Sequence, residues 1–254
     1  MRPRTGQDGV VQVRFVGSGD AFGSGGRWQT CIRVAAGGMV LLVDCGATSL
    51  TALKSQGLDP DAVDAVLVTH LHGDHFGGLP FLILDGQFSR RSRPLLIAGP
   101  PGIRARLTEA METLFPGSSR AERRFKVEVA ELAADGTPAG LGAARIRGWE
   151  VDHASGAPSL AVSVELGGAT FGYSGDTQWT PALSQASRGA GLFAVEAYTF
   201  DRRVRYHLDY LTLQEHLDDL PAERIVLTHM SMAMLSRLAD ADLPAAYDGM
   251  LIDN

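Results

Sequence analysis

The chain is poor in cysteine and has no long apolar run. Its 254 residues include only two cysteines, Cys31 and Cys45, and both lie in apolar segments. We therefore expect buried, reduced thiols and no disulfide framework. No apolar run approaches the length that crosses a bilayer, and the polar opening at residues 1–9 shows no signal-peptide pattern. These absences favour a cytoplasmic protein without a membrane partner.

Positive charge is also scarce. The chain has 23 Lys and Arg against 29 Asp and Glu, which gives a formal net charge of −6. This balance argues against a surface built to grip long nucleic acid. A basic cluster at residues 202–205 lies near other candidate site residues. It is either a solvated loop or a contact for an anionic substrate.

Linkers are the third absence. No stretch is rich enough in Pro, Gly or Ser to separate two domains, and the length suits one large α/β domain. We therefore expect a single domain over residues 1–254. The hydrophobic content of 45% and the charged content of 20% are ordinary for a soluble globular protein with a substantial core.

What the sequence does contain is a dense group of metal-ligand side chains after an apolar run. Residues 65–68 predict a buried strand, and the next seven residues include His70, His72, Asp74 and His75. Imidazole nitrogens and a carboxylate together suit zinc and its borderline neighbours. The alternative is a polar surface loop that happens to be rich in histidine.

Periodicity and turn residues predict strands that alternate with helices. One helix is predicted to start in a capping box, Thr212-Leu213-Gln214-Glu215. The predicted helices are 48–56, 79–87, 103–115, 181–187, 212–220 and 232–239. The predicted strands are 10–16, 30–35, 39–44, 65–68, 94–98, 125–132, 144–151, 159–166, 169–173, 192–197 and 224–228.

Two short internal echoes suggest a repeated arrangement. Residues 66–70 resemble residues 225–229, and both segments end in Thr-His. In each half, a strand that ends near an aspartate (Asp44 or Asp176) precedes the strand that ends in histidine. We therefore expect two related halves, each a sheet with helices outside, that face each other across one cleft.

Three further ligand-type residues follow strand-like runs later in the chain: His153, Asp176 and His229. Taken alone, each late histidine is more often a core or surface histidine than a metal ligand. Together with the first group, however, they make seven residues. Seven such ligands can complete two metal sites that share one carboxylate.

The motif His70-x-His72-x-Asp74-His75, followed in order by His153, Asp176 and His229, resembles that of the metallo-β-lactamase superfamily. The resemblance covers nearly the whole chain and implies an α/β fold, the four-layer αββα sandwich. It also implies that His70, His72 and His153 bind one divalent metal. Asp74, His75 and His229 would then bind a second, with Asp176 as the bridge. The mixed donor set favours zinc and also accepts manganese or iron.

Such a centre has a clear chemical use. Two divalent ions about 3.5–4 Å apart can share a hydroxide and clamp a scissile group. The pKa of a water bound to zinc falls to about 7, so a metal-bound hydroxide is available at neutral pH. Asp74 can orient or deprotonate that water while it serves as a ligand.

Other residues indicate which branch of the superfamily the chain resembles. The presence of both His75 and Asp176 argues against a true β-lactamase, and the motif lacks the glutamate of the flavin-linked diiron oxygen reductases. The segments 195–200 and 206–212 resemble the ribonuclease Z-like phosphodiesterases. That resemblance implies that Glu196 orients His207, which would donate a proton to the leaving oxygen or stabilise charge on a phosphate. His207 could instead be structural, and His216, inside a predicted helix, is expected to be structural.

One departure from ribonuclease Z bears on the substrate. Only about fifteen residues separate Asp176 from the predicted strand at 192, and they contain no long glycine- and proline-bearing arm for transfer RNA. We therefore expect a dinuclear metal-dependent hydrolase acting on a small or nucleotide phosphodiester. A lactonase or thioesterase of the same superfamily and a non-catalytic metal-binding protein remain as alternatives. A homodimer is common among similar proteins, and the sequence leaves the oligomeric state open.

Overall fold

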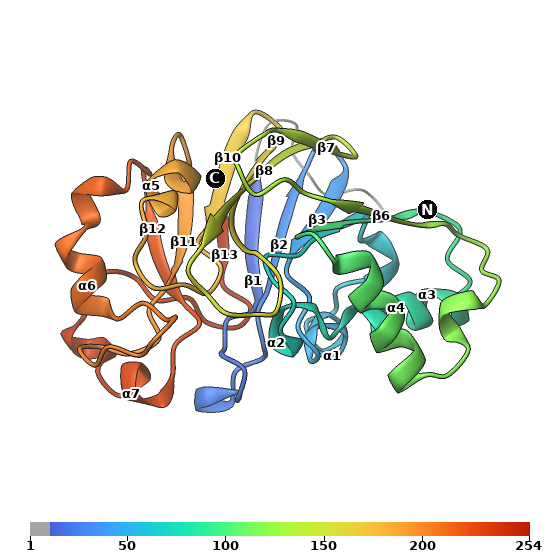
Figure 1. Cartoon of the computed structure of the whole chain (residues 1–254), viewed down its shortest axis with the longest axis horizontal. Helices are drawn as coiled ribbons and strands as arrows, with labels where there is room; N and C mark the ends of the chain where they lie inside the picture. Colours follow the sequence, from blue (N-terminus) through green and yellow to red (C-terminus); the bar gives the residue numbers. More distant parts are fainter. Residues whose placement is uncertain (1–10) are drawn as a thin grey trace.

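Two β-sheets lie face to face with helices on their outer sides in the computed structural model, which describes residues 11–254 (Figure 1). The start of the predicted first strand at Val10 and the polar opening lie outside the described residues. One sheet has the order β13-β1-β2-β3-β4-β5-β6, and the other has the order β12-β11-β10-β9-β8-β7. The strands of the first sheet are β1 (Gln12–Gly17), β2 (Cys31–Ala36), β3 (Met39–Val43), β4 (Ala65–Leu67), β5 (Leu95–Gly99), β6 (Val127–Glu131) and β13 (Leu251–Asp253). Those of the second sheet are β7 (Ala139–Leu141), β8 (Ala144–Val151), β9 (Ser159–Leu166), β10 (Ala169–Tyr173), β11 (Leu192–Glu196) and β12 (Ile225–Thr228).

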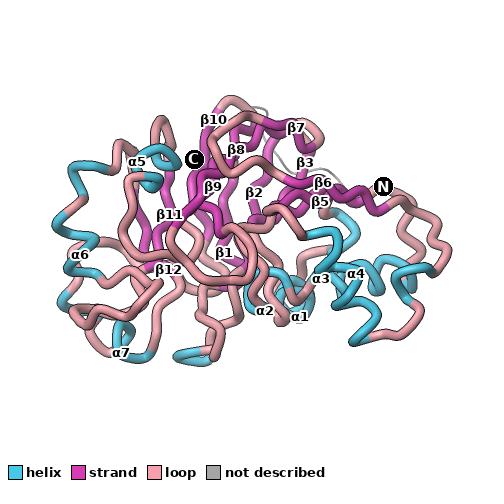
Figure 2. Tube along the Cα trace, viewed as in Figure 1, coloured by secondary structure: helices cyan, strands magenta, loops and turns pink. Residues whose placement is uncertain are grey.

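Helices cover both outer faces, so the layers run α, β, β, α. On the outer side of the first sheet lie α1 (Ser49–Ser55), α2 (Gly73–Phe76), α3 (Leu79–Phe88) and α4 (Ile103–Leu114). On the outer side of the second lie α5 (Ala182–Ser187), α6 (Tyr210–Glu215) and α7 (Met232–Leu235). Figure 2 shows the strands gathered centrally, with helices on either flank. The predicted sandwich is therefore confirmed.

Strand β4 shows why the sequence builds four layers. Ala65 and Leu67 point into the core between the sheets, whereas Val66 and Val68 point toward the outer helices. Because side chains alternate along a strand, burial on both faces produces an uninterrupted apolar run. Replacing the fully buried Leu67 with alanine would cost about 2–5 kcal/mol in transfer and cavity free energy.

The two sheets repeat one topology. In each, an antiparallel meander (β1-β2-β3 or β8-β9-β10) continues into parallel strands (β4-β5-β6 or β11-β12). Asp44 and Asp176 both follow the third strand of their meander, as expected. The first parallel strand after the meander is β4 in one sheet and β11 in the other. Residues 225–229 belong to β12 and the residue after it, so the sequence echo with residues 66–70 does not match the topological counterparts.

Several predicted boundaries are wrong. The helix placed at 212–220 begins at Tyr210, because the Asp209 carboxylate accepts hydrogen bonds from the Thr212 N–H and hydroxyl; Thr212 is therefore not the cap. Regular α-helix ends at Glu215 and is followed by a short 3₁₀ turn. The segment 232–239 is helical only over Met232–Leu235, with another 3₁₀ turn at Leu238–Asp240. The short strands β7 and β13 were not predicted.

The structure bears on two features that the sequence lacks, a disulfide framework and a membrane-spanning segment. Cys31 and Cys45 are free, fully buried thiols packed beneath the outer helices of the first sheet, as predicted. Burial raises the pKa of the Cys31 thiol to about 12, so it is inert at neutral pH. Over residues 11–254, none of the helices combines the length and apolarity that a membrane span requires.

Candidate metal centre

All seven predicted ligands meet at one end of the strands. His70 follows β4, His153 follows β8, and Asp176 follows β10. His229 comes directly after β12, and the short helix α2 carries Asp74 and His75, with His72 at its N-cap. Since β4, β8, β10 and β12 all deliver ligands beyond their carboxyl ends, the fold brings together residues up to 159 positions apart in the chain, from 70 to 229.

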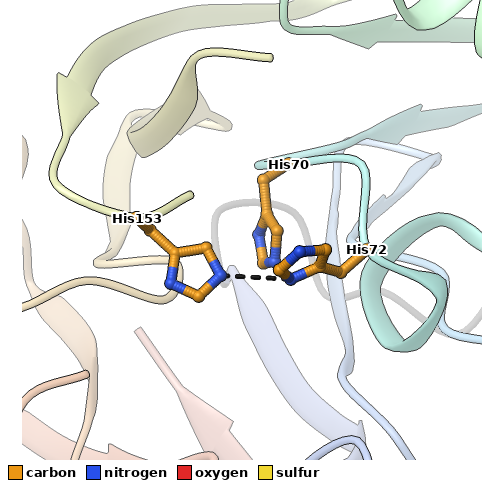
Figure 3. Close-up of side chains that lie close together, drawn as sticks. All are labelled: His70, His72 and His153. Atoms are coloured by element: carbon orange, nitrogen blue, oxygen red, sulfur yellow. Dashed lines mark hydrogen bonds between the residues drawn. The ribbon is translucent and has the colours of Figure 1, made fainter. Parts of the chain in front are cut away.

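The first cluster consists of three imidazoles, from His70, His72 and His153 (Figure 3). Their ring centroids are 4.8–4.9 Å apart in every pair. The His153 Nε2 and His72 Nδ1 atoms lie only 3.1 Å apart. The Nδ1–H of His153 donates to the Tyr206 carbonyl at 2.9 Å, which directs the Nε2 lone pair toward the cluster.

The second cluster adds carboxylates. Asp74, His75, Asp176 and His229 place ligand atoms within 4.8 Å of one another, and all four side chains are buried. Asp74 Oδ2 lies 3.2 Å from both His75 Nε2 and His229 Nε2. The structure therefore groups the residues as the resemblance implied.

Asp176 lies between the two clusters. Its carboxylate oxygens are 3.2 Å from His75 Nε2 and 3.4 Å from His229 Nε2 on one side. On the other side they are 3.9 Å from His70 Nε2 and 4.0 Å from His153 Nε2. A single carboxylate is thus within reach of cations held by either cluster.

The donor atoms fit a bound cation. The buried Nε2 of His70 has no hydrogen-bond partner among the described residues. The Nε2 atoms of His75 and His229 face each other at 3.3 Å, a distance that a shared proton or a metal must account for. Burial disfavours charge on both rings, but the carboxylates led by Asp176 outweigh it. They raise the pKa of His75 well above its usual range and that of His229 to about 10.

Asp44 lies next to the predicted ligands and orients two of them, a role that was not predicted from the sequence. The Nδ1–H of His75 donates to Asp44 Oδ2 at 2.6 Å, so His75 presents Nε2 to the cluster. The Thr69 hydroxyl donates to the same carboxylate and accepts from His70 Nδ1 at 3.1 Å, which fixes His70 likewise. Asp44 is fully buried and has a left-handed φ of 61°, uncommon for a residue with a side chain. Only the echo with Asp176 pointed to it.

Close backbone contact holds α2 in place. Cys45 N donates to the His75 carbonyl at 2.6 Å, and Ala47 N donates to the Gly73 carbonyl at 3.1 Å. A Cβ atom on Gly46 would lie 2.2 Å from the Asp74 carbonyl oxygen. Glycine is therefore required where the loop after β3 meets the helix that carries two ligands.

The glycine-rich segment after β1 contacts the centre through its backbone. His229 N donates to the Ser18 carbonyl at 3.1 Å. Asp248 accepts from the Ser18 N–H and hydroxyl, both at 2.9 Å, and from Trp28 N at 2.8 Å. This segment therefore fixes the backbone of a ligand, a role that the sequence analysis missed because Asp248 is 230 residues from Ser18.

The buried Glu196 and the partly exposed His207 form a pair beside both clusters. Glu196 accepts from His207 Nδ1 and, through its other oxygen, from Thr177 N at 2.9 Å and Leu208 N at 3.3 Å. The His207 ring lies edge-on to His153, with centroids 5.0 Å apart, and parallel to His229 at 6.1 Å. Burial opposes charge on the imidazole, but the hydrogen bond to Glu196 outweighs it and raises the pKa of His207.

The remaining candidates lie farther from the ligands. His216 stacks on Trp179, with centroids 4.0 Å apart and planes within 5°, and hydrogen bonds to Asp219. These contacts agree with the structural role predicted for it. The arginines of the 202–205 cluster are exposed, and Arg203 and Arg205 line a surface cavity of about 320 Å³ that also reaches His207.

The fold and the seven clustered His and Asp side chains define a protein of the metallo-β-lactamase superfamily, in its ribonuclease Z-like branch. The chain belongs to the family of the anti-Pycsar protein Apyc1, whose model matches residues 11–242. It is 32% identical to the ribonuclease Z of Mycobacterium marinum over 193 residues, which cover 72% of this chain and 68% of the relative. The chain is thereby an enzyme of the metal-dependent hydrolase class.

Solved structures agree with the sandwich. The metallo-β-lactamase-fold protein YhfI from Bacillus subtilis superposes with a TM-score of 0.81 at 19% identity, covering 98% of this chain and 100% of YhfI. The short form of human tRNase Z superposes with a TM-score of 0.76 at 25% identity, covering 95% of this chain and 98% of the other. The chain spans a smaller share, 31–50%, of five other curated relatives named ribonuclease Z.

Proposed function

We propose that this chain is a dinuclear phosphodiesterase that hydrolyses a small or nucleotide phosphodiester. The observation that carries the proposal is the Glu196–His207 pair, a proton donor placed beside two ligand clusters that a carboxylate links. A metal centre alone suits many hydrolyses. An imidazole that lies outside the ligand set and is held by a carboxylate suits a reaction whose leaving group needs a proton.

Each cluster is assigned one divalent cation, with zinc as the expected metal and manganese or iron as the alternatives. His70, His72 and His153 would hold one; Asp74, His75 and His229 would hold the other; Asp176 would contact both. When bound, the cations supply Lewis acidity toward the phosphoryl oxygens and lower the pKa of a coordinated water.

Asp74 is assigned a second task besides ligation. Its Oδ2 atom is engaged by the Nε2 atoms of His75 and His229. Its Oδ1 atom has no such contact with a residue in the described part of the chain. That oxygen is available to accept a hydrogen bond from the attacking water and so to orient it toward phosphorus.

His207 is assigned the role of proton donor. Because its Nδ1–H is committed to Glu196, Nε2 is the nitrogen that can carry and release a second proton. The raised pKa of His207 favours the protonated form that this role needs. Transfer of that proton to the leaving oxygen, as its bond to phosphorus breaks, yields an alcohol in place of a strongly basic alkoxide.

The local structure supports a small substrate. The segment between Asp176 and β11 forms only a connecting loop and the six-residue helix α5. It therefore contains no arm that could grip a transfer RNA. Arg203 and Arg205, which line the cavity next to His207, are candidate contacts for other anionic groups of the substrate.

A substrate panel with zinc- or manganese-loaded protein tests the proposal. We expect turnover of aryl and cyclic nucleotide phosphodiesters, loss of activity in His207→Ala toward poor leaving groups, and near-normal activity in the control Phe88→Ala, whose side chain is exposed on α3. Turnover of lactones or thioesters without any phosphodiester would overturn it. Precursor transfer RNA belongs in the same panel, because the Mycobacterium marinum relative is named ribonuclease Z. Efficient processing of that RNA would show that the enzyme acts on a transfer RNA and not only on a small phosphodiester.

A further inference from the structure

Tyr198 lies two residues beyond Glu196, where the chain leaves β11. Its backbone N–H donates to the Leu208 carbonyl at 2.8 Å, next to His207 in the chain. Its carbonyl accepts from Ser231 N at 3.0 Å, two residues after the ligand His229. The main chain of Tyr198 is therefore fixed relative to both the presumed proton donor and a metal ligand.

The side chain of Tyr198 covers the ring of His207. Their centroids are 4.5 Å apart and their planes differ by 27°, which is a stacked arrangement. The Tyr198 ring is also 6.2 Å from that of His229. No hydrogen bond joins its hydroxyl to another of residues 11–254, and its observed side-chain contact with the Glu196–His207 pair is through the ring face.

His207 needs such a neighbour. The Glu196 carboxylate holds Nδ1 and is itself anchored by Thr177 N and Leu208 N. The hydrogen bond fixes the position of Nδ1, whereas the plane of the imidazole also depends on the rings packed around it, of which Tyr198 lies nearest. Rotation of that plane would move Nε2 off the leaving oxygen, and proton transfer depends strongly on such alignment.

We propose that Tyr198 is a positioning residue that sets the plane of the His207 imidazole and so aims Nε2 at the leaving oxygen. This rests on the proposed phosphodiesterase function. An aromatic ring of similar size should serve equally, because stacking requires the face and not the hydroxyl.

Leaving-group dependence separates this role from a general structural one. For Tyr198→Ala we expect kcat to fall about tenfold or more with alkyl phosphodiesters, but less than about threefold with 4-nitrophenyl esters, which need little protonation. Tyr198→Phe should retain more than half of the activity on both. Phe88→Ala, which removes an aromatic side chain that is 81% exposed on α3, is the matched control.

A double-mutant cycle tests whether Tyr198 acts through His207. In the His207→Ala background, Tyr198→Ala should cause little further loss. Equal losses in both backgrounds, equal losses for good and poor leaving groups, or a Phe variant as impaired as the Ala variant would each overturn the proposal. Thermal unfolding of all variants shows whether an Ala variant lost activity because it failed to fold.

A readout that needs no turnover keeps the test separate from the proposed function. In the metal-loaded protein, the carbon-bound protons of the His207 ring should show an upfield NMR shift from the Tyr198 ring in the wild type and Tyr198→Phe. The shift should disappear in Tyr198→Ala. Its absence from the wild type would overturn the positioning role, whereas its presence without any phosphodiester turnover would contradict only the proposed function.

Discussion

The two ligand clusters differ in charge although one carboxylate, Asp176, lies between them. The first cluster has three imidazoles. Burial lowers the pKa of His70 well below its usual range, helped by the neighbouring His75 and other histidines, so its nitrogen is a free lone pair at neutral pH. In the second cluster the carboxylates, led by Asp176, raise the pKa of His75 and His229 against the effect of burial and so favour their protonated forms. Burial therefore favours a neutral donor at His70, whereas a cation entering the second cluster must compete with protons.

Removal of the shared carboxylate should have the largest effect, since it affects both clusters. We predict that Asp176→Ala lowers kcat by about 10³-fold or more and reduces the bound metal below two equivalents, because both cations lose a ligand. Elemental analysis of purified protein and steady-state rates measure the two effects. Full retention of two tight metals would show that Asp176 does not link the clusters.

A matched pair of ligand variants separates the clusters. We predict that His72→Ala spares the second cluster and His75→Ala spares the first, so each retains about one tight metal equivalent while activity falls about 10²-fold or more. Isothermal titration with zinc gives the stoichiometry of each variant. Loss of both metals in either variant would mean that the clusters fill as a single cooperative unit.

Substitution of Asp44, which hydrogen bonds to the predicted ligand His75, should lower metal affinity and activity less than substitution of a ligand. Asp44→Asn keeps the size of the side chain but replaces the carboxylate that accepts from His75 and Thr69. We predict a decrease of about 10- to 100-fold in metal affinity or activity, with a greater effect on the second cluster. Titration in the His72→Ala and His75→Ala backgrounds assigns the decrease to a cluster. Equal weakening in both would place the effect on the Thr69–His70 contact as well.

The sequence indicated the seven clustered side chains better than the residues that support them. Four ligands lie within six residues of one another, so their chemistry is local and visible. The contact between Asp44 and His75 spans 31 positions and exists because β3 and β4 are neighbours in the sheet. Hydrophobic periodicity gives each strand but not which strand lies beside it, so such a partner stays hidden.

The start of α6 was predicted wrongly because two nearby residues can each cap a helix. Both Asp209 and Thr212 have a side chain that can cap a helix, and each fits the sequence pattern. Pairing decides between them: Thr199 bridges to Asp209, and Tyr210 N donates to the Thr199 carbonyl, so Asp209 is held extended and the helix begins after it. The strand β13 has only three residues, none of them buried, and so leaves no apolar pattern to detect.

The pH dependence of metal binding should show the difference in charge directly. In the His72→Ala variant, zinc must displace protons from His75 and His229, whose folded-state pKa values are raised, that of His229 to about 10. Each unit of pH between 6 and 9 lowers the proton concentration tenfold while His229 stays mostly protonated, so affinity should increase by up to about tenfold per pH unit for each proton released. In His75→Ala the low pKa of His70 means that little proton is displaced, and affinity should change little above pH 7. Titrations in buffers of different ionisation enthalpy count the protons, and equal release from the two variants would remove the proposed difference between the clusters.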